Sequence, residues 1–197
     1  VITFLSLMDC SAAMASRVPS AVLITAPTPV FASGLAVVAS EKVLNDASRN
    51  KIDGLIYVTQ SPESTIPTTA CLLHERLGLA ENCLAFDLNQ GCSGFVYGLS
   101  MASGLLRTEQ ITRCLLVCAE GYSKYIAPDD RTCRPIFSDG ASAVIIDAAG
   151  SGDIGPFVFA TDGKGAPNLA LKKNNGVHLY PPRKLSNIYS SMILTTM

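Results

Sequence analysis

The sequence has little charge, and the charge that it has is nearly balanced. Only 16% of its 197 residues are Asp, Glu, Lys or Arg, against roughly 25% in an ordinary soluble domain. The formal net charge is -1 at pH 7, which excludes the basic footprint of a nucleic-acid-binding domain or of a protein drawn to an anionic membrane. Because so few charges cannot hydrate every face of the domain, we expect a large surface to be covered.

Other features are lacking as well. The seven cysteines are an odd number without a paired framework, so a reduced, cytoplasmic compartment fits better than an oxidising one. Internal repeats and low-complexity tracts are missing. The apolar stretch 21–38 is interrupted by Pro27, Pro29 and Gly34 before it reaches bilayer-spanning length. The apolar segment 1–15 has no cationic start, unlike a secretory signal. We therefore expect a protein without a membrane segment.

The sequence is, in contrast, rich in apolar residues. They make up 48% of the chain, and the mean hydropathy is +0.32, which excludes a disordered tail or a fully solvated coil. A chain of this length is sufficient for one domain with a substantial core.

From residue 34 onward, short apolar runs alternate with segments of helical spacing. Continuous apolar runs of five or six residues are typical of strands buried on both faces. Strands are predicted at 54–59, 83–88, 114–119 and 143–146, with a weaker one at 22–25, and helices at 35–47, 67–77 and 93–107. This alternation predicts an α/β fold with a mixed, mostly parallel sheet and helices on both faces.

The predicted helix at 93–107 has no polar face. It contains no charged residue before Arg107, and small residues fill the positions between its large apolar ones. A helix of this kind is buried on all sides, and its glycines allow close approach of other backbones. We expect a second layer to cover it.

Cys92 is the principal candidate for chemistry. It lies between a predicted strand and the apolar helix, where unpaired backbone N–H groups and the helix dipole favour a thiolate. The same N–H groups could stabilise an oxyanion, and Gly91 and Gly94 relieve crowding at such a turn. The alternative is that Cys92 is a small buried packing residue. The spacing alone leaves both interpretations open.

Three segments carry a resemblance to a known family. They are IPTTACLLHERLGL (66–79), AFDLNQGCSGFVYGL (85–99) and DDRTCRPIFSDGASAVII (129–146). Together they resemble 3-oxoacyl-acyl-carrier-protein (ACP) synthase III of the thiolase superfamily, over about residues 36–165. The resemblance implies a thiolase-like N-terminal half domain at 34–165 with a buried helix that follows the nucleophile. Residues 1–33 are then an atypical N-terminal segment and 166–197 a short C-terminal tail.

The resemblance also implies site residues. Cys92 corresponds to the nucleophile that takes an acyl group from acyl-CoA or acyl-ACP for Claisen condensation with malonyl-ACP. Arg131 corresponds to a coenzyme A contact, although an ion pair with a neighbouring Asp129 or Asp130 is the alternative. Ile66 resembles the residue that reaches across a homodimer into the partner's acyl pocket. Thioesters of coenzyme A and ACP are the implied substrates, and no permanently bound cofactor is expected.

Two further parts of the resemblance concern the second half of segment 129–146. Phe137 resembles an aromatic wall of the acyl pocket, although core packing alone would also explain a phenylalanine there. Asp139 and Gly140 resemble a structural turn near the active site, to which we assign no direct chemistry.

The sequence departs from the family where condensation is concerned. In the family, a histidine and an asparagine well over a hundred residues beyond the nucleophile support that step. His178 is the sole histidine downstream here, and its setting does not resemble the family motif; Asn174, Asn175 and Asn187 match no asparagine motif either. His74, in a polar helical stretch, is expected to be solvated.

Other functions remain as alternatives. One alternative is a truncated or non-catalytic subunit that dimerises and needs another polypeptide for the His and Asn half of the site. Another is a cysteine hydrolase, for which the sequence shows no base. Cys114 and Cys118 share a strand face without further ligands nearby, so no metal site is predicted.

Overall fold

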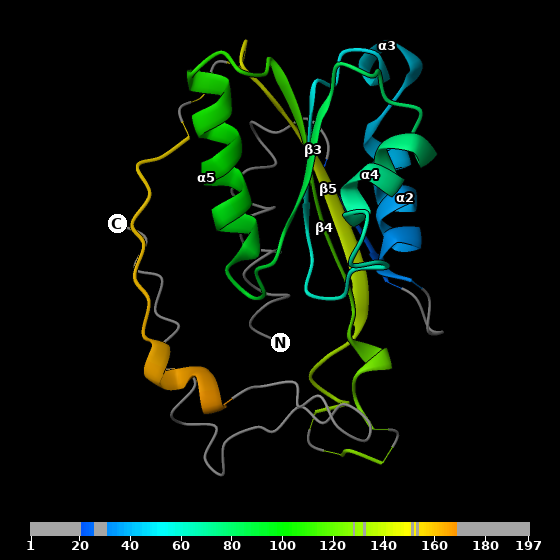
Figure 1. Cartoon of the computed structure of the whole chain (residues 1–197), viewed down its shortest axis with the longest axis vertical. Helices are drawn as coiled ribbons and strands as arrows, with labels where there is room; N and C mark the ends of the chain where they lie inside the picture. Colours follow the sequence, from blue (N-terminus) through cyan, green and yellow to red (C-terminus); the bar gives the residue numbers. More distant parts are fainter. Residues whose placement is uncertain are drawn as a thin grey trace. The chain divides into compact units, whose positions relative to one another are not determined.

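The structure is a computed structural model that describes residues 21–25, 31–127, 129–131, 133–150, 152 and 154–168. Strands and helices alternate over most of this range (Figure 1). The strands are β1 (Ala21–Thr25), β2 (Gly54–Val58), β3 (Leu84–Leu88), β4 (Arg113–Gly121) and β5 (Asp139–Asp147). The α-helices are α2 (Ala32–Val43), α3 (Asp46–Arg49), α4 (Thr69–Arg76) and α5 (Gly94–Arg107), and two 3-10 helices are η1 (Tyr122–Lys124) and η2 (Gly163–Asn168).

The strands form one sheet in the order β1-β5-β4-β2-β3. β2 lies between β3 and β4 and is parallel to both, whereas β5 is antiparallel to β4 and to β1. The predicted mixed, mostly parallel sheet is therefore confirmed. The five residues of β2 are all buried, as their continuous apolar run predicts for a central strand covered on both faces.

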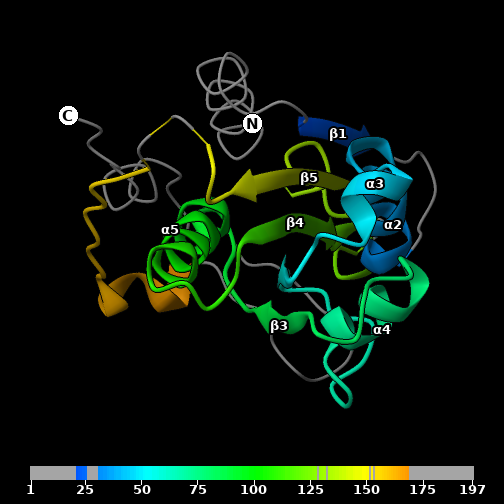
Figure 2. The ribbon, with the colours of Figure 1, turned by 90° about the horizontal axis from the view of Figure 1, so that it is seen from above.

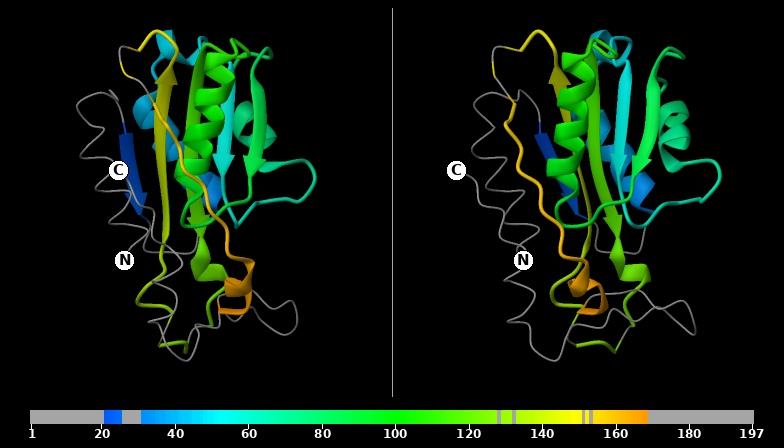
Figure 3. Two further views of the ribbon diagram at one scale, coloured as in Figure 1. Left: turned by 90° about the vertical axis from the view of Figure 1, so that its left-hand side faces the viewer. Right: turned by 60° about the vertical axis from the view of Figure 1, so that its left-hand side comes forward.

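Helices cover both faces of this sheet. α2 and α4 lie on one face and α5 on the other, as Figure 2 shows, and both views of Figure 3 show α5 in front of the sheet with its axis running nearly along the strands. The main core forms where α2 and α4 meet the sheet, around side chains such as Leu35, Tyr57, Leu73 and Leu115. Among the described residues, no helix combines the length and apolar character that crossing a bilayer requires.

The predicted helix 35–47 is divided in two. α2 ends at Val43 because Leu44 adopts an extended backbone, with ψ of 143°. Asn45 then caps α3: its side chain accepts a hydrogen bond from the Ser48 backbone N–H at 2.8 Å, and the Ser48 hydroxyl accepts one from the Asn45 N–H at 2.9 Å. This reciprocal capping box favours a new helix over a continued one.

The predicted helix 67–77 also starts later than expected. Pro67 lies before the N-cap Thr68 and outside the first helical turn of α4. The predicted stop is confirmed, since Gly78 follows with φ of +57°, the left-handed conformation that glycine adopts at helix ends. The weak strand prediction at 22–25 is confirmed by β1.

The described residues form two compact units. The first comprises those up to Gly121 together with Asp139–Pro156, and the second comprises Tyr122–Ser138 and the residues from Phe157 onward. The sheet and the helices α2 to α5 belong to the first unit. The predicted divisions at 34 and 166 stay predictions, because most of the flanking segments lies outside the described residues.

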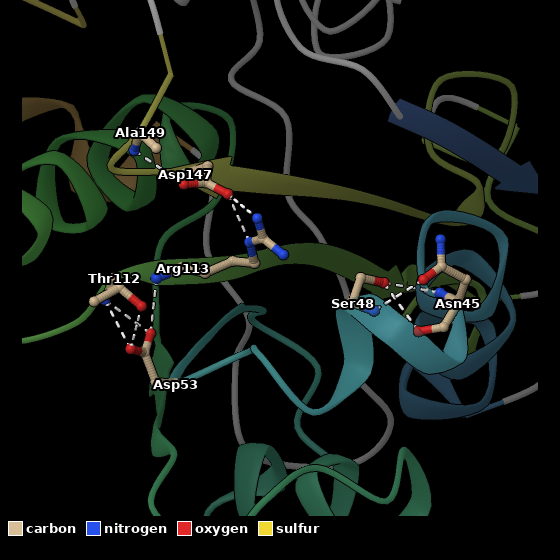
Figure 4. A network of polar contacts seen from close by, with 7 residues as sticks. All are labelled: Asn45, Ser48, Asp53, Thr112, Arg113, Asp147 and Ala149. Carbon is tan, nitrogen blue, oxygen red and sulfur yellow. Dashed lines mark hydrogen bonds and ion pairs between the residues drawn. The ribbon is translucent and has the colours of Figure 1, made fainter.

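A polar network joins the strands at the edge where β2 and β4 begin (Figure 4). The Asp53 carboxylate accepts hydrogen bonds from the backbone N–H groups of Thr112 and Arg113, at 2.8 Å for the closest pair of atoms in each case, and from the Thr112 hydroxyl at 2.7 Å. Arg113 forms an ion pair with Asp147. The network thus connects the residue before β2 to the start of β4 and the end of β5, and it lines a polar hollow of about 320 Å³.

Candidate active site

Cys92 lies at the opposite edge of the sheet, in the turn that connects β3 to α5. β3 ends at Leu88, Ser93 is the N-cap of α5, and the helix begins at Gly94. The Cys92 side chain is exposed. The prediction that Cys92 stands at a strand-to-helix turn is confirmed, and the alternative of a buried packing residue is wrong.

The backbone of this turn is tightly hydrogen-bonded. The Gln90 N–H donates to the Leu88 carbonyl at 3.0 Å, and the Gly94 N–H donates to the Gly91 carbonyl at 2.8 Å. The Tyr97 N–H donates to the Ser93 carbonyl at 3.1 Å, which is the first hydrogen bond of the helical ladder. The amides just before Tyr97 have no acceptor within the helix, so the positive end of the helix dipole lies at the turn that contains Cys92.

Two glycines allow this turn and the helix to approach the sheet. A Cβ atom at Gly91 would lie 2.5 Å from Oε1 of Gln60, and one at Gly94 would lie 2.4 Å from Cγ1 of Val58. Real Cβ atoms do not approach so closely. At Gly94 the neighbour is the buried Val58, so this position requires the absence of a side chain. At Gly91 the neighbour is the end of the exposed Gln60 side chain, which could move aside. The packing therefore supports the predicted role for Gly94 more strongly than for Gly91.

The described residues cover α5 mainly on one side. The helix buries the side that faces the sheet, at Gly94, Gly98, Leu99, Ala102, Ser103 and Leu106. Met101, by contrast, is 40% exposed, and a Cβ at Gly104 would meet nothing within 4 Å. Within the described residues a single sheet covers only one face of the helix, and the expectation of a second layer over the other face stays a prediction.

Ile66 lies in the loop between β2 and α4, within the same compact unit as Cys92. Its side chain is 86% exposed. The loop is held locally: the Ser64 hydroxyl donates to the Ile66 carbonyl at 2.7 Å.

Arg131 and Phe137 belong to the second compact unit. Arg131 is exposed, and the ion pairs found among the described residues do not include it. Phe137 packs against a small apolar cluster of Ile126 and Cys133. This packing accords with the alternative that Phe137 is a core residue of its unit.

Three other sequence expectations need correction or fall outside the described residues. Asp139 and Gly140 are the first residues of β5, paired with the end of β4, and do not form a turn. His74 is half-buried, and its Nε2 lies 2.9 Å from the Ala80 carbonyl oxygen, so it is not simply solvated. His178 and the candidate asparagines Asn174, Asn175 and Asn187 lie outside the described residues.

The sequence reasoning missed Glu120, at the end of β4. Its carboxylate accepts the Gln60 backbone N–H at 2.7 Å and the Ser61 hydroxyl at 2.7 Å. Burial raises the pKa of Glu120 to about 7, although these hydrogen bonds act to lower it. The single sequence signal was an acidic residue directly after an apolar strand (CLLVCAE), and its partners lie about sixty residues away.

The sequence around Cys92 is similar to that of a known protein family. Residues 86–163 match the family model of 3-oxoacyl-[acyl-carrier-protein (ACP)] synthase III. This range includes Cys92, Arg131 and Phe137 but not Ile66.

Similar proteins carry the same description. A beta-ketoacyl-[acyl-carrier-protein] synthase III of Streptomyces coelicolor is 35% identical over 164 residues, which cover 82% of this chain and 48% of the relative. The corresponding protein of Alkalilimnicola ehrlichii is 45% identical over 102 residues, 52% of this chain and 32% of the relative. A crystal structure of a 3-oxoacyl-(acyl-carrier-protein) synthase III superposes with a TM-score of 0.72 at 37% identity, over 85% of this chain and 56% of that one. The chain thus spans about a third to a half of the curated relatives that it matches.

Proposed function

Because the chain is a 3-oxoacyl-ACP synthase III-like protein, we propose that it is a cytoplasmic acyltransferase whose Cys92 accepts an acyl group from an acyl-CoA or acyl-ACP thioester. The observation that carries the proposal is the exposed thiol in the turn before α5. A thiol in this turn is accessible to a substrate, and the N-terminus of α5 that follows it offers backbone N–H groups to an oxyanion.

The proposed step is a thioester exchange. The Cys92 thiolate attacks the thioester carbonyl, and first-turn N–H groups of α5 stabilise the oxyanion that forms. Collapse of this intermediate breaks the bond between the carbonyl carbon and the sulfur of the donor. The donor leaves as a thiolate and takes up a proton, and the acyl group remains on Cys92 as a new thioester.

Three other residues are proposed to bind the substrate. Arg131 would contact coenzyme A with a guanidinium that is exposed and outside the described ion pairs, and Phe137 would form a wall of the acyl pocket. Ile66 would enter the pocket of a partner subunit, for which its 86% exposure leaves it available. A homodimer is further supported by β3, an edge strand of the sheet whose residues are exposed or half-buried, since open edges favour pairing.

We further propose that the acylated Cys92 serves a Claisen condensation with malonyl-ACP, as in fatty-acid biosynthesis. Decarboxylation of the malonyl group would release carbon dioxide and leave a carbanion that attacks the acyl carbonyl. The new carbon–carbon bond would form as the bond to the sulfur breaks, and Cys92 would leave as a thiolate. Because the sequence offers no match to the histidine and asparagine motifs of the family, we expect acyl transfer from this chain alone but no condensation.

A second candidate function follows from the outer side of α5. Met101 and Gly104 leave an apolar surface open on the helix that follows Cys92, and this surface favours a subunit that another polypeptide completes. A monodisperse monomer that unfolds cooperatively and binds no hydrophobic dye would contradict this second candidate.

The experiment that tests acyl transfer is intact-mass spectrometry after incubation with short-chain acyl-CoAs. We expect one acyl adduct that is absent in Cys92→Ala. Cys71→Ala is the matched control, because Cys71 is also exposed but lies within α4. Arg131→Ala should raise the acyl-CoA concentration needed for half-maximal labelling, whereas Arg134→Ala, another exposed arginine of the same unit, should not.

The possible outcomes separate the two functions. An adduct that persists in Cys92→Ala would refute the role of this thiol. The absence of any adduct across several chain lengths would favour the non-catalytic subunit.

A further inference from the structure

Glu120 and Gln60 meet at the sheet edge that carries Cys92. Val58 is in register with Cys118 of β4 and with Leu88 of β3. Val58 faces α5, since its Cγ1 lies 2.4 Å from the position that a Cβ atom of Gly94 would occupy. Side chains two residues apart along extended chain share a face, so Glu120 follows Cys118 on the α5 side of the sheet. Its partner segment, at Gln60, continues from the end of β2.

The Glu120 carboxylate organises the segment that follows β2. One oxygen accepts the Gln60 backbone N–H, and the other accepts the Ser61 hydroxyl, each at 2.7 Å. The Ser61 hydroxyl oxygen in turn accepts the Gly121 N–H at 2.8 Å. Hydrogen bonds to an ionised carboxylate are roughly twice as strong as neutral ones, so this segment is held firmly to the end of β4.

The Gln60 side chain connects this hydrogen-bonded segment to the turn that contains Cys92. Its Oε1 lies 2.5 Å from the position that a Cβ atom of Gly91 would occupy, and its amide carbon lies 3.2 Å from it. The Gln60 amide therefore packs directly on Gly91, the residue before Cys92. A displacement of the Gln60 backbone would remove the support on this side of the turn.

We propose that Glu120 is a positioning residue for Cys92, acting through Gln60. The inference rests on the proposed function, since it assigns Cys92 as the acyl acceptor. Glu120 does not take part in bond making; it fixes the Gln60 backbone, and the Gln60 amide holds the Gly91–Cys92 backbone in place for attack.

The surroundings of Glu120 make this support dependent on pH. Burial raises its pKa to about 7, well above that of an ordinary glutamate. Cys118, two residues earlier on the same strand, shares this face, and Tyr57 of β2 lies on the opposite face but within reach of the Glu120 charge; the pKa values of both are raised, by burial first and by the Glu120 charge in addition. Both are uncharged near neutrality. Glu120 is therefore ionised above about pH 7, and it becomes a weaker acceptor as the pH falls below that value.

The test compares Glu120→Gln, Gln60→Ala and the double variant with the unmodified chain between pH 6 and 9. Two rates are measured at Cys92: formation of the acyl adduct, and alkylation by iodoacetamide, resolved by peptide mass. We expect Glu120→Gln to lower both rates at least about threefold at pH 8 and to remove the inflection near pH 7. The acyl-CoA concentration for half-maximal labelling should not change, because the donor site is not touched.

Coupling between the two residues is the sharper criterion. If they act through one contact, the double variant should be no slower than the slower single variant. Glu109→Gln, an exposed glutamate after α5, is the matched control and should leave both rates unchanged. Far-UV circular dichroism and urea unfolding show whether each variant is folded. If Glu120→Gln fails to fold, Gln60→Ala still tests the contact with Gly91, because this variant retains the Glu120 carboxylate and its hydrogen-bond partners.

The results distinguish this proposal from the proposed function. Unchanged rates in Glu120→Gln, or losses that add in the double variant, would overturn the positioning role. If the unmodified chain forms no acyl adduct, the acyltransferase proposal fails, and the alkylation rates still decide whether Glu120 and Gln60 position the thiol.

Discussion

Gly94→Ala is the substitution that tests most directly how α5 is held against the sheet. A Cβ atom at this position would lie 2.4 Å from Cγ1 of Val58 and 3.3 Å from Cβ of Gln90. Val58 is buried in the central strand, and its β-branched side chain has few alternative rotamers. The helix start, and not Val58, must therefore move.

The magnitude follows from two opposing effects. Inserting a methyl group into packed surroundings costs about 1–3 kcal/mol, whereas alanine in place of glycine favours the helix by up to about 1 kcal/mol. The net loss in the free energy of unfolding should be about 1–2 kcal/mol. Gly104→Ala is the matched control, because Gly104 lies in the same helix and a Cβ atom there would meet nothing within 4 Å; this variant should gain about 0.5–1 kcal/mol.

The assay is urea unfolding of both variants, followed by far-UV circular dichroism, together with the alkylation rate of Cys92. The two variants should differ in the free energy of unfolding by about 2 kcal/mol, which corresponds to about 4–8 °C in Tm for a chain of this size. The Cys92 rate should change only in Gly94→Ala. Equal stabilities for the two variants would mean that α5 does not lie against Val58.

Two further predictions concern the other edge of the sheet. Burial acts to raise the pKa of Asp53, but the hydrogen bonds from Arg113 and Thr112 outweigh it and hold that pKa below its usual value. The ionised Asp53 carboxylate therefore stabilises the fold above its unfolded pKa, and this stabilisation is lost as the pH falls below about 4. Asp53→Asn should lower the free energy of unfolding by about 1–3 kcal/mol at pH 7 and by less in acid. The measurement is urea unfolding, and a difference between variant and unmodified chain that is constant at all pH values would contradict this. Asn45→Ala should cost about 1 kcal/mol through the lost cap on α3, measured in the same way, and no change would mean that the Ser48 box contributes nothing to stability.

The sheet was predictable from the sequence because its strands are apolar on both faces. The run at 54–59 indicates a central strand without any knowledge of its neighbours, and β2 is fully buried. The extent of β5 was not predictable in this way. Asp139 and Gly140 are typical turn residues by composition, yet they pair with β4, because the ladder supplies partners for their backbone groups that the local sequence does not reveal.

The candidate site was predictable only where its residues lie close together in the sequence. Cys92 stood out because a strand, two glycines and a helix lie next to each other in the sequence, but this order left its role open, and the resemblance to 3-oxoacyl-ACP synthase III decided it. Glu120 was missed because its partners at Gln60 and Ser61 are about sixty residues away, and because its pKa depends on burial. The apolar pattern of α5 predicts cover on every side without saying which chain provides it, and the described residues cover only the side that faces the sheet.

The two edges of the sheet are connected through strand register. Asp53, by binding the backbone at Thr112 and Arg113, fixes the start of β2 against the start of β4. This register pairs Val58 with Cys118 at the other end, so that Glu120 comes within hydrogen-bonding distance of the Gln60 backbone. Because side chains alternate between faces along a strand, a shift of one residue would turn Glu120 away from α5. The network around Asp53 lies at the end of the strands that is farthest from Cys92. It is nevertheless required for the contact through which Glu120 and Gln60 are proposed to position Cys92.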